Sequence, residues 1–188
     1  MGRSRTTRSV ALVAVTACLS APVLAQTRDD AIILINGTVP AGCRAGEVLG
    51  GDDTFDMGVL IDTSTGLLRP DLNAVDKVVV GSFCNTQSTL TVSAIPMSAE
   101  DVQSLGSDAF TRRIDFVATA SGWTDVPARF ETALGETQAA AAQIQPNPTD
   151  VDLILSLSNF TPNGGMDRRP VASDDYVGQV TLTLTPSF

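Results

Sequence analysis

A C-terminal segment in which apolar and polar residues alternate constrains the fold of this chain more than any other feature. In residues 176–185, one face carries Tyr176, Gly178, Val180, Leu182 and Leu184, and the other carries glutamine and threonine. A period of two is typical of a β-strand with one face buried and one in solvent. We therefore expect the chain to finish in a strand that lies over a hydrophobic core.

Further segments of this kind precede it and are separated by turn residues. Some alternate, and others are continuously apolar and β-branched, which is typical of strands covered on both faces. Helices long enough for a parallel crossover are missing, so the pattern predicts an all-β fold, an immunoglobulin-like two-sheet antiparallel β-sandwich. The predicted strands comprise residues 31–35, 53–61, 77–84, 89–95, 113–119, 151–157 and 176–185.

One or two short helical turns complete the expected fold. Pro96 is expected to end the strand before it, and the spacing of polar residues from Ser98 predicts a helical turn as far as Gly106. Residues 131–145 give no clear assignment, because their alanines favour helix while glycine and proline limit it. The sequence leaves the role of residues 98–150 open. Trp123, the only tryptophan, is expected to anchor the core.

The N-terminus has the features of an export signal. A basic start with Arg3, Arg5 and Arg8 precedes an apolar stretch over residues 10–19 and a small-residue site ending at Ala25. These features predict a signal peptide over residues 1–25, cleavage between Ala25 and Gln26, and a single domain over residues 26–188. The protein is then expected in the periplasm or at the surface of a bacterium.

A lipoprotein signal is the competing interpretation of the same segment. In that case Cys18 would be acylated and would become the first residue of the mature protein. Otherwise the chain would meet the membrane only through the cleaved signal, because no stretch approaches the ~20 apolar residues of a transmembrane helix.

The charge of the chain excludes binding to polyanions. Removal of the signal takes away three of the twelve basic residues and none of the twenty-one acidic ones, so the formal net charge changes from −9 to −12. Nucleic-acid binding depends on clustered lysine and arginine, and we therefore expect no nucleic-acid partner.

Two cysteines remain after the signal, Cys43 and Cys84. An even number of cysteines in an exported protein predicts a disulfide bond. The bond would close a loop of about 40 residues, which stabilises the fold by about 4 kcal/mol in the chain-entropy estimate.

The sequence offers little material for catalysis. It contains no histidine, so histidine-based nucleophile activation and histidine metal ligation are impossible. Asp52, Asp53 and Asp56 could line a calcium site but lack the spacing of a calcium-binding loop, and a solvated acidic loop is the simpler interpretation. We expect neither enzymatic activity nor a cofactor, and an enzyme based on two carboxylates is the least favoured hypothesis.

Five motifs follow one another along the chain, in residues 37–43, 55–58, 78–84, 89–94 and 176–186. Taken in this order, they resemble those of bacterial pilin-like proteins, in particular the spore coat protein U group, which includes archaic chaperone–usher pilus subunits. The similarity covers roughly half of the mature chain, and Met57 interrupts one motif of the family, a phenylalanine followed by glycine.

The resemblance implies a structural or adhesive subunit that associates by strand complementation. Such subunits have an incomplete sandwich, which a strand from a chaperone or from another subunit completes. Here the donor strand would come from residues 31–39, so copies of the chain, related subunits and a periplasmic chaperone are the implied partners. The candidate strand-exchange residues are Ile33, Ile35, Val39, Val180, Leu182 and Leu184.

A second hypothesis stays open beside the first. In it, the chain's own residues 31–39 complete the sheet, and the protein is a self-contained periplasmic immunoglobulin-like domain that binds a ligand or coats the envelope without polymerising.

Overall fold

The structure is a computed structural model that describes residues 34–187, and within them all regular structure except three short 3-10 turns is β-strand. The chain divides into two units, residues 1–38 and 39–188, and the account below concerns the second unless stated. The strands are β1 (Cys43–Arg44), β2 (Glu47–Val48), β3 (Lys77–Val80), β4 (Phe83–Cys84), β5 (Ser88–Ala99), β6 (Phe110–Thr111), β7 (Arg113–Ser121), β8 (Ala128–Glu131), β9 (Ala142–Gln145), β10 (Thr149–Asp150), β11 (Leu153–Pro162), β12 (Arg169–Pro170) and β13 (Tyr176–Pro186).

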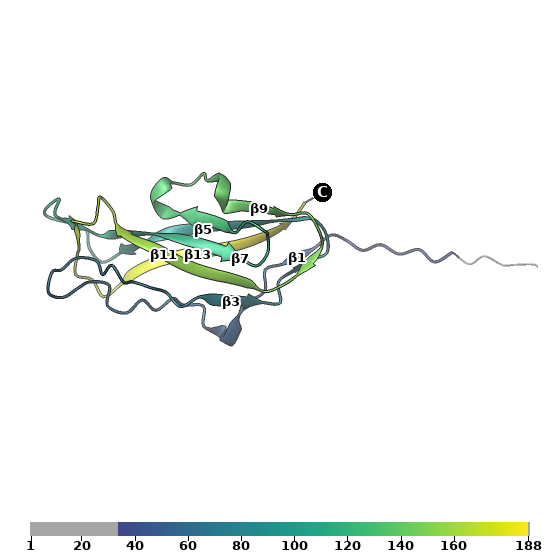
Figure 1. The fold of residues 1–188 in the computed structure, drawn as a ribbon, viewed down its shortest axis with the longest axis horizontal. Coiled ribbons are helices and arrows are strands. Elements are labelled where there is room, and N and C mark those ends of the chain that lie inside the picture. The colour runs from purple at the N-terminus through teal and green to yellow at the C-terminus, as the bar shows by residue number, and fades with distance from the viewer. Residues whose placement is uncertain (1–33, 188) are drawn as a thin grey trace, which may run out of the picture. The chain divides into compact units, whose positions relative to one another are not determined.

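The main sheet has the strand order β13-β5-β7-β11-β3-β2, with β8 added to β7 and β9 added to β5. All of these pairs are antiparallel, as predicted for an all-β chain. β5 pairs with β13 over almost its full length but with β7 only at Met97 and Ser98. The sheet therefore consists of two groups of strands, β9-β5-β13 and β8-β7-β11-β3-β2, joined at Met97 and Ser98 of β5. Figure 1 shows the long strands β5, β7, β11 and β13 running along the long axis of this unit.

One hydrophobic core lies between the two groups of strands. Leu90 and Val92 of β5 contribute to it, as do Phe116 of β7 and Leu157 of β11. Trp123 is 1% exposed, and its indole N–H donates a hydrogen bond of 3.2 Å to Ser88 Oγ. The prediction that Trp123 anchors the core is therefore confirmed.

A small three-stranded sheet, β1-β4-β10, holds the predicted disulfide bond. Cys43 and Cys84 are direct cross-strand partners, and their sulfur atoms are bonded. Next to the bridge, the Asn85 side chain accepts a hydrogen bond from the Gly42 N–H and donates one to the Pro40 carbonyl, both at 2.8 Å. The chain before β1 is therefore fixed to the chain after β4.

The predicted end of a strand at Pro96 is wrong, because β5 continues to Ala99. The register of β5 with β13 shifts by one residue here, so that Pro96 and Met97 lie opposite the single residue Gly178. A β-bulge accommodates proline because its extra residue needs no ladder hydrogen bond. The predicted helical turn from Ser98 is wrong for the same reason, since Ser98 pairs with both Val177 and Arg113.

The predicted strand over residues 53–61 is also not formed; only Ile61 makes a bridge, to Leu68. Two aspartates explain the difference. Asp52 accepts a hydrogen bond from the Thr54 N–H, and Asp56 accepts one from the Gly58 N–H. These short-range bonds occupy backbone groups that a ladder would need.

The predicted strand over residues 31–35 is not formed at Leu34 and Ile35, the two of its residues that the structure describes. Residues 34–39 form no strand, and Leu34, Ile35 and Val39 are 80%, 94% and 86% exposed, although an apolar run predicts burial. Residues 31–33 lie outside the described part. The other strand predictions are confirmed as β3, β4, β5, β7, β11 and β13, although β11 begins at Leu153 and leaves Val151 partly exposed.

Residues 131–145, which gave no clear assignment, contain 3-10 turns at Thr132–Leu134 and Ala139–Ala141, followed by β9. Thr132 connects the first turn to the sheet, because its hydroxyl accepts a hydrogen bond from the Phe116 N–H and donates one to the buried Asp115 carboxylate. The segment is thus an insertion that covers part of β7 and β5.

Removal of the disulfide should destabilise the domain by about 4 kcal/mol, because the unfolded chain regains the freedom of a loop spanning 41 residues. Urea denaturation of the Cys43→Ser/Cys84→Ser variant measures this loss. Reduced and alkylated wild-type protein should give the same urea midpoint as the variant. If both samples unfold at the midpoint of the oxidised wild type, the prediction is contradicted.

Gly46→Ala should destabilise the domain by at least about 2 kcal/mol. Gly46 has a φ of 83°, and a Cβ there would collide with the Val80 carbonyl oxygen. Gly42→Ala is the matched control, because its Cβ would meet no atom within 4 Å, and it should change the unfolding free energy by less than about 0.5 kcal/mol. Equal effects in thermal or urea unfolding would contradict the assignment.

Candidate functional site: a groove beside the last strand

The last strand leaves one of its two edges open. β13 stands at the end of the sheet order, and among the described residues its only ladder is with β5. An open edge presents unpaired backbone N–H and C=O groups in a row, which can template pairing with another strand. The free edge of β13 is therefore the first component of the site.

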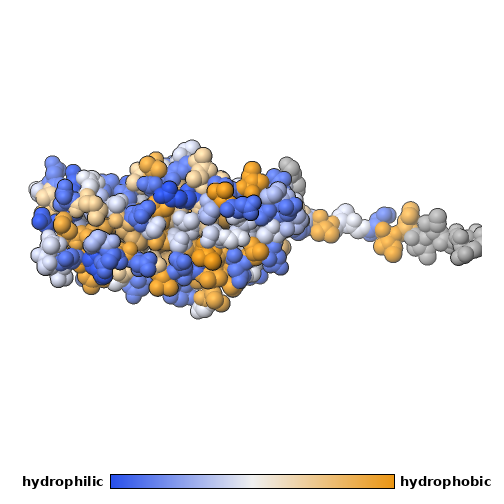
Figure 2. All heavy atoms as spheres, in the orientation of Figure 1, coloured by the Kyte–Doolittle hydropathy of each residue, from blue (hydrophilic) through white to orange (hydrophobic). Residues whose placement is uncertain are grey.

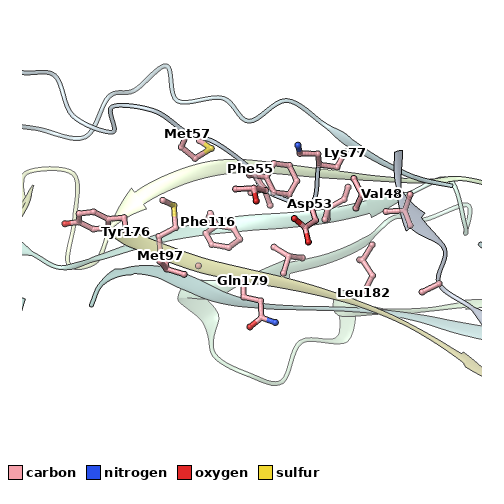
Figure 3. A pocket seen from close by; sticks show the side chains of 18 of the residues that line it. Val48, Asp53, Phe55, Met57, Lys77, Met97, Phe116, Tyr176, Gln179 and Leu182 are labelled. Carbon is pink, nitrogen blue, oxygen red and sulfur yellow. The ribbon is translucent and has the colours of Figure 1, made fainter. Parts of the chain in front are cut away.

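A groove of about 660 Å³ runs along this edge. On one side it is lined by Tyr176 to Val180 and Leu182 of β13, and on the other by β2, by β3 and by the chain that connects them. Figure 3 shows Val48, Phe55 and Lys77 on the far side and Met97 and Phe116 between them and β13. The groove thus lies between β13 and β2, the two end strands of the main sheet, which do not pair with each other.

The floor of the groove is the hydrophobic core itself. Phe116 is 2% exposed and Leu155 is 7% exposed, and both line the groove together with Leu157. Around them, Val180, Leu182 and Met97 pack against the core but are only partly buried. Part of the core therefore lies close to solvent at this point.

On the side seen in Figure 2, apolar and polar residues of the second unit are interspersed. The lining of the groove is mainly apolar.

The wall opposite β13 is held by the only lysine of the chain. Lys77 Nζ lies 2.6 Å from Asp52 Oδ2 and 5.7 Å from the centre of the Phe55 ring. The hydrogen bond from Lys77 lowers the pKa of the Asp52 carboxyl below its ordinary value, with a further contribution from the Thr54 N–H. Phe55 and Met57 pack against the core, and Asp56 between them is exposed, so the side chains of this wall alternate although it is unpaired.

Tyr176 closes one end of the groove. Its hydroxyl donates a hydrogen bond of 3.0 Å to the Val171 carbonyl. Burial raises the pKa of this hydroxyl above its ordinary value, and the nearby Asp101 charge acts in the same direction. The ring is therefore fixed at the start of β13.

The structure brings together only some of the residues predicted to act in strand exchange. Val180 and Leu182 line the groove, and Leu184 continues the same face against the core. Ile35 and Val39 are exposed, and Ile33 lies outside the described residues, as do Cys18, Ala25 and Gln26.

The sequence did not identify the floor and the far wall. Phe116 belongs to a predicted strand, but nothing in its local pattern distinguishes a face that meets a groove from one that meets another sheet. Met97 lies beyond Pro96, where the strand was expected to end. The alternation of Phe55 and Met57 was the available signal for the far wall.

Asp52, Asp53 and Asp56 are the residues that the sequence offered as possible calcium ligands. Asp52 pairs with Lys77, and within residues 34–187 no cluster of three cysteine or acidic side chains has the geometry to hold a metal ion. In the same part of the chain, no helix has the length and apolar character of a membrane span.

Comparison of the chain with protein-family models, curated proteins and solved structures gave no match.

Lys77→Met should raise the pKa of Asp52 towards its ordinary value, because it removes the ammonium group that stabilises the carboxylate. In the wild type, Asp52 therefore keeps its negative charge to a lower pH than in the variant. Carboxyl titration by NMR measures the shift. Asp71, whose pKa is lowered by Arg69, is the internal control and should not change; equal shifts at both residues would contradict the assignment.

Proposed function

We propose that this protein is an exported, non-catalytic structural or adhesive subunit that assembles by β-strand complementation, similar to pilin subunits of the spore coat protein U group. The observation that carries the proposal is the apolar groove along the free edge of β13.

The strand order supports an immunoglobulin-like sandwich that lacks its last strand. In immunoglobulin constant-type domains, strands A, B, E and D form one sheet in that order, and C, F and G form the other. Taken in chain order, β2, β3, β5, β7, β11 and β13 correspond to A, B, C, D, E and F, and the order β2-β3-β11-β7 reproduces A-B-E-D. Within residues 34–187, no strand stands beside β13 in the position of G.

An incoming strand would satisfy both components of the groove. Its backbone would pair with the free edge of β13, which supplies affinity, and alternate side chains would cover Phe116 and Leu157, which supplies specificity. Fully burying one isoleucine or leucine side chain contributes about 1.5–3 kcal/mol. Two or three such side chains, added to the backbone hydrogen bonds, can offset much of the entropy lost by ordering a strand.

Residues 31–39 have the composition of such a strand. In extended conformation Ile33, Ile35 and Val39 point to one side, and the two of these that the structure describes are exposed. A subunit with a free apolar strand and an apolar groove can join head to tail with its copies, and it needs a chaperone to cover the groove before assembly. The disulfide suits the oxidising compartment in which this would happen.

The self-contained domain is the alternative, in which the chain's own residues 31–39 occupy the groove.

Complementation between two variants tests the proposal. Ile33→Asp/Ile35→Asp removes the donor, and Leu182→Asp places a charge in the groove. Neither mature protein should assemble alone, since each lacks one component, whereas an equimolar mixture should give a dimer by light scattering after gel filtration. Thr181→Asp, on the exposed face of β13, should assemble like the wild type.

A mixture that stays monomeric while each protein is folded by circular dichroism would refute strand exchange. A wild type that is monomeric, and in which Ile35 is protected from solvent, would favour the self-contained domain.

A further inference from the structure

We propose that the groove takes residues 31–37 of a second copy antiparallel to β13, in the register that sets Ile35 beside Gly178. The inference rests on strand exchange as the function, and it specifies the direction and alignment of the partner strand. Three observations carry it: the sizes of the β13 side chains, the charges at the two ends, and the fixation of Pro40.

The groove face of β13 alternates in size. Tyr176 is large, Gly178 has no side chain, and Val180 and Leu182 are larger again. Gly178 cannot be replaced without strain, because a Cβ would lie 3.0 Å from Met97 Cγ and 3.1 Å from the Ile95 carbonyl oxygen. Gly178 therefore presents no side chain on this wall, and Met97 and the Ile95 carbonyl occupy the place where one would stand.

We place a large side chain of the incoming strand beside Gly178, because β13 offers no side chain of its own at this position. There it would contact Phe116, the floor of the groove, and Met97, whose unbranched side chain can adapt to a new neighbour. By the same reasoning, a small residue is required beside the fixed ring of Tyr176.

The sequence of the donor alternates in the complementary way. With Ile35 beside Gly178 in an antiparallel pair, Gly37 lies beside Tyr176 and Ile33 beside Val180, while Ala31 lies beside Leu182. Each large residue then meets a small or medium one. If Val39 lay beside Tyr176 instead, Gly37 would lie beside Gly178 and leave a cavity, which is unfavourable.

Charge at the groove ends sets the direction. Near Tyr176, a second hollow is lined by Asp56 and Asp174, and by Asp52, which is paired with Lys77. At the other end β1 packs beside β13, and its Arg44 is paired with Glu47. The donor carries Asp29 and Asp30 just before its apolar run. Antiparallel pairing keeps these carboxylates away from the acidic end, whereas parallel pairing brings them towards it.

The fixation of Pro40 distinguishes exchange from self-insertion. Asn85 holds Pro40 beside the end of β13, because the neighbouring Gln87 accepts a hydrogen bond from the Ser187 N–H. From that point the chain's own residues 39 to 31 could follow β13 only from its C-terminal end to its start, which is a parallel pair. An antiparallel pair therefore requires a second copy.

Cysteine cross-linking of the full mature chain reads the register directly. A donor variant, Asn36→Cys, is mixed under mild oxidation with one of three acceptor variants, Val177→Cys, Gln179→Cys or Thr181→Cys. All four positions are exposed, so folding should be unaffected. The proposed register sets Asn36 beside Val177, and we expect that mixture to give at least tenfold more disulfide dimer than the others. Ser158→Cys on β11, also exposed, is the control acceptor.

The other outcomes overturn the inference in distinguishable ways. If the Asn36→Cys variant cross-links between copies preferentially to position 179 or 181, the register is refuted and strand exchange stands. The same holds if no cross-link forms while the complementation mixture still dimerises. A disulfide within one chain in the Asn36→Cys/Thr181→Cys double variant would demonstrate parallel self-insertion. Failure of both cross-linking and complementation would remove the proposed function as well.

Discussion

The ladder between β13 and β5 is the interaction on which the rest of the structure depends. It joins the last strand of the chain to a strand at its middle, and the bulge at Pro96 and Met97 sets its register. Because this ladder uses only one edge of β13, the other edge and the apolar side chains beside it must find a partner elsewhere or stay near solvent. The groove follows from this one-sided pairing.

The other features keep the groove in shape without filling it. The disulfide and Asn85 fix the chain at one end of β13, while Tyr176 closes the other. Lys77 holds the far wall through Asp52 and Phe55. A groove built in this way is preorganised, so that an incoming strand bears most of the ordering entropy alone. The proposed role in assembly would use each of these features.

Local chemistry explains where prediction from the sequence succeeded. Cys43 and Cys84 could be paired by counting, and the alternation in β11 and β13 identified their buried faces. Prediction from the sequence failed where pairing between distant segments competes with local signals. Pro96 normally ends a strand, but pairing on both sides of β5 carried the strand past it through a bulge. Residues 53–61 alternate like a strand, yet two aspartates bind the backbone locally and leave that segment unpaired.

The sequence by itself determined the period of each strand, the disulfide and the absence of histidine, because each depends on residue type and spacing along the chain. Only the tertiary structure decided which strand stands at the edge and which apolar faces converge on a groove. Strand order depends on contacts between residues far apart in the chain, and an alternating segment looks the same whether one or both of its edges are paired. The open edge of β13 is therefore a property of the assembled sheet, and no single segment encodes it.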